Sequence, residues 1–289
     1  MRVLFVHPSP LMYSEIFLRL EPLGLELVAS AARAAGHEVR LIDLQVLPHA
    51  ALTKEIAEFR PDALGISLNY LANIPEAIDI AHRTKQVLPD CFVFFGGHSV
   101  SFIAAEVIDQ AGGAVDAVVR GEGEPAVGPL LDAVRDGGVA EVPGVVTADG
   151  AGPAPTMLEG IDGHLPAREL TRRRRRYFIG ELDPCASIEF TRGCPWDCSF
   201  CSAWTFYGRS YRKGAPEALG RQLASIREPN VFIVDDVAFI RPEHGHGIAD
   251  EIERRKIRKR YYLETRSDVL LRNTEVFRRW AGLGLEYMF

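Results

Sequence analysis

The 289-residue chain is 47% apolar and 25% charged, the composition of an ordinary globular protein with one large domain or two. Its formal net charge of −6 argues against a surface that binds nucleic acid as a whole. The apolar run at the N-terminus is too short for a signal peptide, and no stretch approaches the roughly 20 apolar residues that span a membrane. We therefore expect a soluble cytoplasmic protein.

Apolar runs alternate with helical patterns through the first half of the chain. The expected strands are 2–6, 38–43, 63–67, 91–95 and 117–119, and the expected helices are 23–35, 52–59, 74–88, 103–111 and 125–135. This alternation predicts an α/β domain with a parallel sheet and helices on both faces, in the flavodoxin-like doubly wound pattern. Ligands of such sheets bind beyond the carboxyl ends of the strands.

Four loops are expected at that edge of the sheet, at residues 7–10, 69–73, 96–99 and 121–124. Paired glycines such as Gly96-Gly97 let the backbone approach a ligand closely. Each loop could equally be a tight turn that needs a positive φ, so it is the four loops together that indicate a binding site.

Residues 141–183 are expected to form a hairpin, at 142–150, and then a linker. The stretch 152–166 is rich in glycine and proline and has little periodicity. The run of five arginines at 172–176 is interpreted as a solvated surface segment, with electrostatic contact to anionic lipid or an acidic partner as the alternative. No interleaved aromatic residues support a nucleic-acid arm.

Three of the five cysteines, Cys194, Cys198 and Cys201, follow a short β-type run at 186–190 in a C-x3-C-x2-C spacing. Glycine and proline around the first of them favour an irregular loop that can aim three sulfurs at one point. Thiolates suit zinc and iron–sulfur clusters, and a cubane cluster held by three of them keeps one iron open. The alternative is structural zinc with Cys185 as fourth ligand, although such sites commonly use cysteine pairs from two separate turns. Clustered cysteines in a chain of this length indicate metal binding in a reducing compartment.

The second half resumes the alternation of strands and helices. The expected strands are 187–190, 231–234, 261–263 and the start of a fourth at 285–289, and the expected helices are 216–227, 247–255 and 274–281. Polar residues at the carboxyl ends of barrel strands commonly carry function, and here these are Asp235, Asp236, Glu264 and Arg266. Each could instead be a helix cap or a surface ion pair. Aromatic residues at 204–207 could shield a cluster from water or belong to the core.

The cysteine spacing, with Phe200 directly before the last cysteine, resembles the signature of the radical S-adenosylmethionine (SAM) superfamily. The resemblance implies a [4Fe–4S] cluster on the three cysteines whose open iron binds SAM, and a (βα)6 barrel of which residues 184–289 form the N-terminal half, as in a truncated protein. It implies that the backbone of Phe200 meets the adenine and that Asp235 and Asp236 help to hold the SAM amino group. It further implies that Glu264 and Arg266 contact the ribose or carboxylate.

Residues 1–140 resemble the cobalamin-binding domain that precedes radical SAM domains in a group of methylases, on the phrases at 36–39, 95–98 and 119–124. The Asp-x-His-x-x-Gly motif with a cobalt-ligating histidine is missing from the sequence. The implied cofactor is therefore base-off cobalamin with water or nothing as its lower ligand. The implied cobalamin-binding residues are Ser9, Ser67, Asn69, Tyr70, Asn73, Gly96, Gly97, His98, Gly121 and Glu122.

The segments 7–15, 67–73 and 202–208 resemble the branch of these enzymes that methylates hopanoid lipids. This implies methyl transfer to an unactivated carbon, C-3 of a pentacyclic triterpenoid, by way of cobalamin and a deoxyadenosyl radical from SAM. It also implies a small-molecule or lipid substrate and a reductant protein such as flavodoxin or ferredoxin, with no nucleic acid, and it leaves open a peripheral membrane contact. The catalytic groups stay unassigned.

Three other functions are compatible with these motifs. One is another cobalamin-dependent radical SAM enzyme, such as a natural-product methylase or a porphyrin ring cyclase. Another is a non-catalytic cobalamin-binding sensor, against which the intact three-cysteine loop argues. A tRNA methylthiotransferase would carry a further set of cysteines in the N-terminal half, where Cys91 alone is present.

Overall fold

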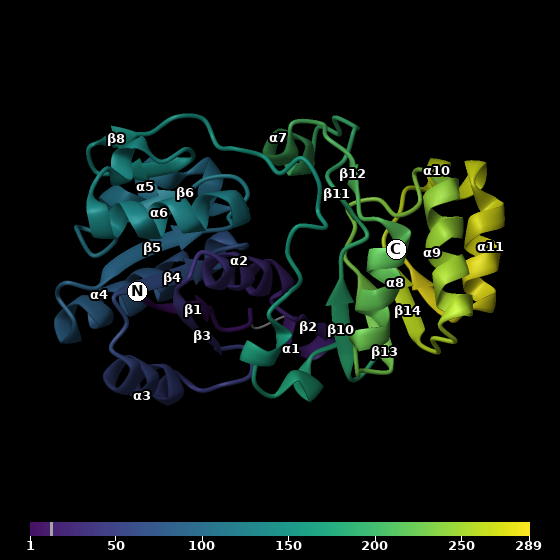
Figure 1. Cartoon of the computed structure of the whole chain (residues 1–289), viewed down its shortest axis with the longest axis horizontal. Helices are drawn as coiled ribbons and strands as arrows, with labels where there is room; N and C mark the ends of the chain where they lie inside the picture. The colour runs from purple at the N-terminus through teal and green to yellow at the C-terminus, as the bar shows by residue number, and fades with distance from the viewer. Residues whose placement is uncertain (12–13) are drawn as a thin grey trace. The chain divides into compact units, whose positions relative to one another are not determined.

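The computed structural model describes residues 1–11 and 14–289. Residues 12–13, part of the distinctive segment 7–15, lie outside the described residues. Contacts divide the chain into two compact units, which Figure 1 shows in sequence colours. Unit 1 comprises Met1–Glu15, Pro22–Leu158 and Pro166–Arg173, and unit 2 comprises Ile16–Glu21, Glu159–Leu165 and Arg174–Phe289.

Unit 1 is built on a seven-stranded sheet in the order β3-β1-β4-β5-β6-β7-β8. The parallel strands are β1 (Arg2–His7), β3 (Glu38–Asp43), β4 (Ala63–Ser67), β5 (Phe92–Gly96) and β6 (Ala117–Val119). They stand in the flavodoxin-like order that the alternation predicted, with β1 between β3 and β4. The hairpin expected after residue 141 is formed by β7 (Val145–Thr147) and β8 (Gly150–Ala151), which extend the sheet antiparallel from β6.

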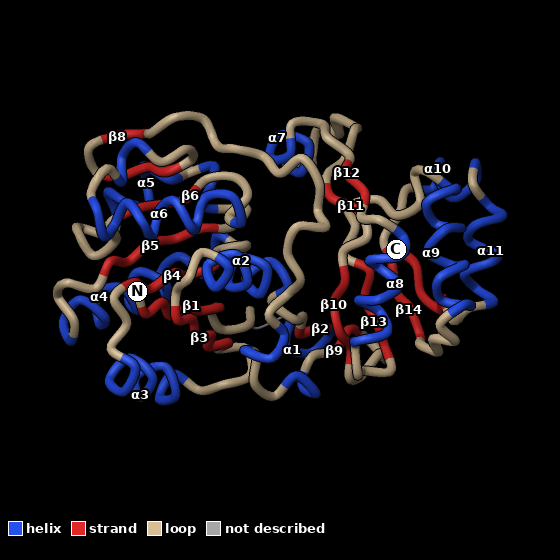
Figure 2. The backbone as a smooth tube through the Cα atoms, in the orientation of Figure 1, coloured by secondary structure: helices blue, strands red, loops and turns tan. Residues whose placement is uncertain are grey.

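Helices cover both faces of this sheet (Figure 2). They are α2 (Leu23–Ala34), α3 (His49–Phe59), α4 (Ile74–Val87), α5 (Ala104–Gln110) and α6 (Glu124–Asp136). Because side chains alternate along a strand, Leu4 and Val6 of β1 pack in one core with residues of α3, α4 and α5. Val3 and Phe5 pack in the other core with residues of α2 and α6. Two buried faces explain why the strands are almost continuously apolar.

Unit 2 contains a four-stranded parallel sheet whose strands follow chain order, as in part of a βα barrel. The strands are β10 (Cys185–Ile188), β13 (Asn230–Ile233), β14 (Arg260–Leu263) and β15 (Leu285–Met288), and the helices are α8 (Pro216–Ser225), α9 (Pro242–Arg254), α10 (Ser267–Arg272) and α11 (Thr274–Gly282). The fully buried Trp280 of α11 anchors the core, with ring centroids 5.0 Å from Phe239 and 5.2 Å from Tyr261. The predicted fold class, a doubly wound sheet followed by a partial barrel, is confirmed.

Several short elements of unit 2 have no counterpart in the sequence patterns. Strand β2 (Leu18–Arg19) follows helix α1 (Ser14–Phe17) and pairs with β9 (Phe178–Ile179), and β11 (Thr191–Arg192) pairs with β12 (Arg212–Lys213). The aromatic stretch after the cysteines, expected as loop, contains helix α7 (Ala203–Tyr207). Two-residue strands carry no periodicity, so a pattern analysis cannot find them.

Single-turn 3₁₀ helices occur in both units. They lie at Leu71–Asn73, Val100–Phe102, Val139–Glu141, Arg168–Leu170 and Arg174–Arg176.

The arginine run is not the uniformly solvated segment that its sequence indicates. Arg174 forms an ion pair with Glu21 and donates from Nε to Glu228 at 3.0 Å, with both carboxylates buried. Burial lowers the pKa of Arg174, but the two carboxylates outweigh this effect and the net pKa is raised. Arg175 and Arg176 are exposed. The prediction was therefore wrong for Arg174, because its two acidic partners lie far away in sequence.

No helix among residues 1–11 and 14–289 is both long enough and apolar enough to cross a membrane.

Candidate functional site

The cysteine loop of unit 2 begins at a turn that only glycine allows. Gly193 has φ +91°, and a Cβ at this position would lie 2.5 Å from the carbonyl oxygen of Ser210. Cys194 follows directly and is buried, whereas Cys198 and Cys201 are partly exposed. The turn thus sends the chain from β11 into the loop with the first sulfur inside the unit.

Two consecutive carboxylates at the end of β13 hold this turn. Asp235, 2% exposed, accepts hydrogen bonds from the Phe190 N–H at 2.7 Å and from the Thr191 N–H and hydroxyl at 3.0 and 2.6 Å. Asp236 accepts from the Gly193 N–H at 3.2 Å. Burial raises the pKa of Asp235 to about 7, against hydrogen bonds that lower it. Asp235 therefore acts on the backbone before the cysteines, whereas Asp236 is surrounded by protein on one side and reaches solvent on the other.

Arg266, which follows β14, and Trp204 of α7 contact the middle of the cysteine loop. Arg266 donates from Nη1 to the Cys198 Sγ at 3.2 Å, and its guanidinium lies 4.6 Å from the ring centroid of Trp196. The indole N–H of Trp204 donates to the Cys198 carbonyl at 3.1 Å. A cation beside a sulfur favours the thiolate, which is the form that binds metals. The sequence left open whether the aromatic residues at 204–207 lie beside the loop or in the core, and the hydrogen bond places Trp204 beside the loop.

The donor set fits an iron–sulfur cluster in its chemistry. Burial raises the pKa of Cys194, and the nearby Cys198 and Cys201 raise it further, so the three thiols are close enough to interact electrostatically. Within the described part of the chain, no group of three His, Cys, Asp or Glu side chains is already arranged to hold a metal ion. Cys185, the fourth ligand of the zinc alternative, packs with Leu182 and Phe232 in a different apolar cluster from that of Cys194.

A second pair of carboxylates stands at the carboxyl ends of β13 and β14. Burial raises the pKa of Glu264, and the charge of Asp236 raises it further. Burial likewise raises the pKa of Asp236, which the Gly193 N–H and Arg192 oppose. Two neighbouring carboxylates with raised pKa values favour a bound cation. Phe200, in contrast, is 91% exposed.

The loops at the carboxyl edge of the unit 1 sheet bring together residues from β1, β4 and β5. Asn69 and Ser99 are joined by a hydrogen bond from the Ser99 hydroxyl to the Asn69 carbonyl at 2.6 Å, and the His98 N–H lies 3.4 Å from the Asn69 Oδ1. Burial lowers the pKa of His98, whose ring packs against Phe102 with centroids 5.3 Å apart. A neutral imidazole against an aromatic ring suits an apolar ligand face.

Large apolar side chains are exposed on two of these loops: Tyr70 and Leu71 after β4, and Phe102 after β5. Ser67 is the last residue of β4 and pairs with Gly96 of β5. Gly97 has φ +115°, and a Cβ there would lie 2.8 Å from the Leu68 carbonyl oxygen. Gly97 is thus needed for the close passage of two loops, whereas Gly96 has an ordinary φ and room for a methyl group.

Three of the predicted cobalamin ligands have structural partners of their own. Glu122 is buried and accepts a hydrogen bond from the Leu158 N–H at 2.7 Å. Gly121 has φ +77° and donates to the Ser101 hydroxyl at 3.1 Å. Ser9 gives its hydroxyl hydrogen bond to Glu76 at 2.5 Å, a partner that the motif analysis did not single out.

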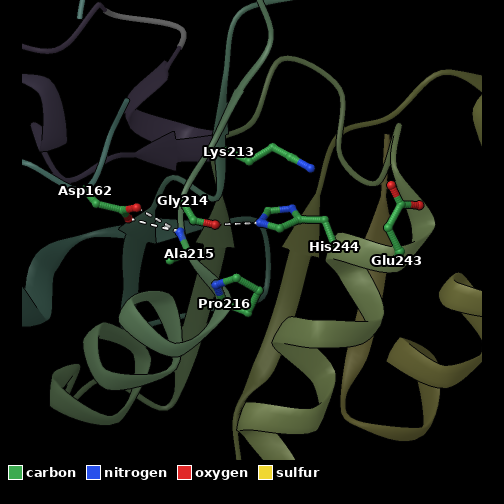
Figure 3. Close-up of a pocket in the computed structure, with 7 residues that line it drawn as sticks. All are labelled: Asp162, Lys213, Gly214, Ala215, Pro216, Glu243 and His244. Carbon is green, nitrogen blue, oxygen red and sulfur yellow. Dashed lines mark hydrogen bonds between the residues drawn. The ribbon is translucent and has the colours of Figure 1, made fainter. Parts of the chain in front are cut away.

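Unit 2 also has a cavity of about 340 Å³ where α8 and α9 begin (Figure 3). It is lined by Asp162, Lys213, Gly214, Ala215, Pro216, Glu243 and His244. The Asp162 carboxylate accepts the Ala215 N–H at 3.0 Å, and the buried His244 donates from Nε2 to the Gly214 carbonyl at 2.8 Å. Burial lowers the pKa of His244. These polar groups hold the backbone that leads into α8, and the cavity lining includes none of the predicted ligands.

A mostly parallel sheet, followed by a parallel sheet with a three-cysteine loop after its first strand, is a fold that this chain shares with solved cobalamin-dependent radical SAM enzymes. The model of the B12-binding domain matches residues 11–131. The solved structure of the cobalamin-dependent S-adenosylmethionine radical enzyme OxsB superposes with a TM-score of 0.80 at 20% identity, over all of this chain and 43% of OxsB. The methyltransferase TsrM from Kitasatospora setae superposes with a TM-score of 0.72 at 19% identity, over 99% of this chain and 66% of TsrM.

Sequence comparison gives a nearer relative. The chain is 60% identical over its whole length to a hopanoid C-3 methylase of Methylococcus capsulatus, of which it covers 56%. It is 31% identical over 87% of its length to an anaerobic magnesium-protoporphyrin IX monomethyl ester cyclase of Rubrivivax gelatinosus, of which it covers 45%. The chain thus spans about half the length of the curated relatives it matches. The resemblance to cobalamin-dependent radical SAM methyltransferases, predicted from the motifs, is confirmed.

Proposed function

We propose that this chain forms the cobalamin-binding domain and the first part of the radical SAM domain of a methyltransferase that acts on C-3 of a hopanoid. The observation that carries the proposal is the 60% identity to a hopanoid C-3 methylase, which extends over both units. The cysteine loop lies within the aligned span and supplies three soft ligands within eight residues.

The three cysteines would hold a [4Fe–4S] cluster. With SAM bound, such a cluster supplies the electron that cleaves SAM to methionine and a deoxyadenosyl radical. Asp235 contributes by holding the turn at Phe190 and Thr191, and Arg266 by holding Cys198. These contacts hold both ends of the path from β10 into the cysteine loop.

The carboxylates of Asp236 and Glu264 would receive the cationic amino group of SAM. Both lie at the strand ends that follow the cysteine loop, and both have a raised pKa, so a neighbouring ammonium would lower the free energy of their charged forms. The backbone of the exposed Phe200 would face the adenine. Asp235, whose two oxygens are engaged by Phe190 and Thr191, would act through the turn instead.

Cobalamin would bind at the carboxyl edge of the unit 1 sheet, where β1 separates β3 from β4 and the crossing direction of the connections changes. The exposed Tyr70, Leu71 and Phe102 would cover one face of the corrin, together with Asn69 and His98. Gly96 and Gly97 would let the backbone approach the macrocycle.

The remaining assignments follow from the substrate. A triterpenoid is insoluble in water, so the enzyme would take it from a membrane surface by peripheral contact, in the cytoplasm. A small reductant protein such as flavodoxin or ferredoxin would deliver electrons to the cluster. Nucleic acid is not expected as a partner, given the net charge of −6.

The second candidate is a porphyrin ring cyclase, favoured by the 31% identity to the magnesium-protoporphyrin cyclase. Full-length protein, reconstituted without oxygen with iron, sulfide and cobalamin, would be incubated with SAM, reductant and either a hopanoid or magnesium-protoporphyrin monomethyl ester. We expect the hopanoid to gain the mass of one methylene group and the Cys198→Ala variant to give no product. Ring closure of the porphyrin would assign the cyclase function instead, and no SAM cleavage with any substrate would favour a cobalamin sensor.

A further inference from the structure

A cluster of polar side chains joins three loops at the carboxyl edge of the unit 1 sheet. Ser9 lies in the loop after β1, His49 is the first residue of α3, and Asn73 and Glu76 lie where the β4 loop enters α4. Strands β3, β1 and β4 are neighbours, so the three loops meet at the point where ligands of doubly wound sheets bind.

Ser9 is held through all its polar groups. Its N–H and hydroxyl donate to the two carboxylate oxygens of Glu76, at 3.0 and 2.5 Å, and its carbonyl accepts from the Asn73 amide at 3.0 Å. The His49 Nε2 lies 2.8 Å from Glu76 and 3.3 Å from the Ser9 hydroxyl, so a proton on this nitrogen is shared between the two oxygens. Glu76 is thus the centre on which the other three converge.

The residues that hold Ser9 stand at positions where they would ordinarily cap helix α4. Asn73 stands at the N-cap of α4, and Glu76 is the third residue of the helix, the positions from which Asn and Glu side chains commonly cap the first turn. Asn73 makes no capping hydrogen bond, and both side chains reach across to Ser9, more than 60 residues away. The helix forgoes this stabilising cap, while the loop after β1 is fixed in place.

We propose that Glu76 is a positioning residue of the cobalamin site, which clamps the loop after β1 to the loop after β4. This inference rests on the proposed function, in which the β4 loop carries the corrin-facing Tyr70. Glu76 acts through its hydrogen bonds to Ser9 and Asn73. Ser9, expected from the resemblance as a direct ligand, is a part of the clamp.

The test is titration of the chain with hydroxocobalamin, followed by visible absorbance. We expect Glu76→Ala to weaken binding about tenfold or more, because the loop after β1 loses its hydrogen bonds to a carboxylate and is no longer fixed beside the loop after β4. Asp79→Asn is the matched control: Asp79 lies on the same helix, is exposed and pairs with Arg83 at 3.0 Å. Its affinity should stay within about twofold of the wild type, because substitutions of exposed side chains usually change little.

A double-mutant cycle separates positioning from general stabilisation of α4. Ser9→Ala should weaken cobalamin binding and make the further effect of Glu76→Ala smaller, because both changes remove the bond between the Ser9 hydroxyl and the carboxylate. Ser9→Thr, which keeps the hydroxyl, should restore affinity. Where Glu76→Ala does not fold, as judged by circular dichroism, Glu76→Gln takes its place in the same cycle.

The outcomes are distinguishable. Wild-type affinity in Glu76→Ala or Glu76→Gln, or strictly additive effects with Ser9→Ala, overturns the clamp and leaves the cobalamin site standing. Failure of the wild-type chain to bind hydroxocobalamin overturns the proposed cobalamin site itself.

Discussion

The two sheets of this chain present their loops at the same kind of edge but stabilise them differently. In unit 1, half-buried polar groups such as Glu76 join neighbouring loops, and exposed apolar side chains such as Tyr70 and Phe102 stand above them. In unit 2, the fully enclosed carboxylate of Asp235 holds the turn, and thiols and carboxylates stand above it. The first edge suits a broad ring system that is bound by shape. The second suits small charged groups and a metal, because its thiols and carboxylates are ligands and charge partners.

The difference also concerns where charge is buried. Burial raises the pKa values of Asp235, Asp236 and Glu264 in unit 2, so its edge holds acidic groups whose charge costs free energy until a cation arrives. At the unit 1 edge, burial instead lowers the pKa of His98, which favours the neutral form of this side chain. Four experiments can break or sharpen this contrast, from the largest expected effect to the smallest.

Removal of one sulfur should have the largest effect. Cys198→Ala, reconstituted anaerobically with iron and sulfide, should retain less than about a tenth of the wild-type iron, because the cluster depends on all three thiolates. Cys91→Ala and Cys185→Ala are the controls: both thiols are buried, burial raises the pKa of each to about 12, and both variants should keep their iron. A single zinc ion that is lost in Cys185→Ala would instead establish the zinc site.

Arg174→Ala should destabilise unit 2 by about 3–5 kcal/mol, because it leaves Glu21 and Glu228 buried without this cation. The exposed Arg175 is the matched control, and Arg175→Ala should change the free energy of unfolding by less than about 0.5 kcal/mol. All three tryptophans, Trp196, Trp204 and Trp280, belong to unit 2, so their fluorescence in urea reports on this unit alone. Equal effects of the two substitutions would restore the interpretation of a solvated run.

Asp235 should make the stability of unit 2 depend on pH. Its pKa rises from 3.8 to about 7 on folding, so the folded state binds more protons than the unfolded state between these values. The stabilisation is complete below about pH 4 and is lost as the pH rises through 7, by roughly 4 kcal/mol at most. Asp235→Asn cannot titrate, and the difference in unfolding free energy between it and the wild type should follow this course. A pH-independent difference would show that folding does not raise the pKa of Asp235.

Gly97→Ala should cost unit 1 about 2 kcal/mol or more, because φ is +115° and the added Cβ meets the backbone of Leu68. Gly96→Ala is the neighbouring control: its Cβ would lie 3.7 Å from the nearest atom, and the cost should stay near or below about 1 kcal/mol. Unit 1 contains no tryptophan, so hydrogen exchange of β5 is the appropriate measurement. Equal protection in both variants would mean that the β4 and β5 loops can separate at little cost.

Local pattern was sufficient for much of this protein. The spacing of apolar residues correctly predicted all five parallel strands of unit 1 and the helices between them. This worked because each of these elements is determined mainly by residues close to it in the sequence. The spacing of Cys194, Cys198 and Cys201 indicated a metal site, because three soft donors in eight residues have few other uses. Gly97 was recognisable as a loop glycine after a strand.

The partners that hold these loops were decided only by the tertiary structure. Asp235 reaches Thr191 across 44 residues, Glu76 reaches Ser9 across 67, and Glu21 reaches the Ser187 N–H at 2.8 Å across 166. The sequence around an acidic residue does not reveal whether its carboxylate caps a helix, forms a surface ion pair or holds a distant loop. Its role is fixed by which groups the packed sheets bring within about 3 Å, and this depends on the order of strands rather than on the order of residues.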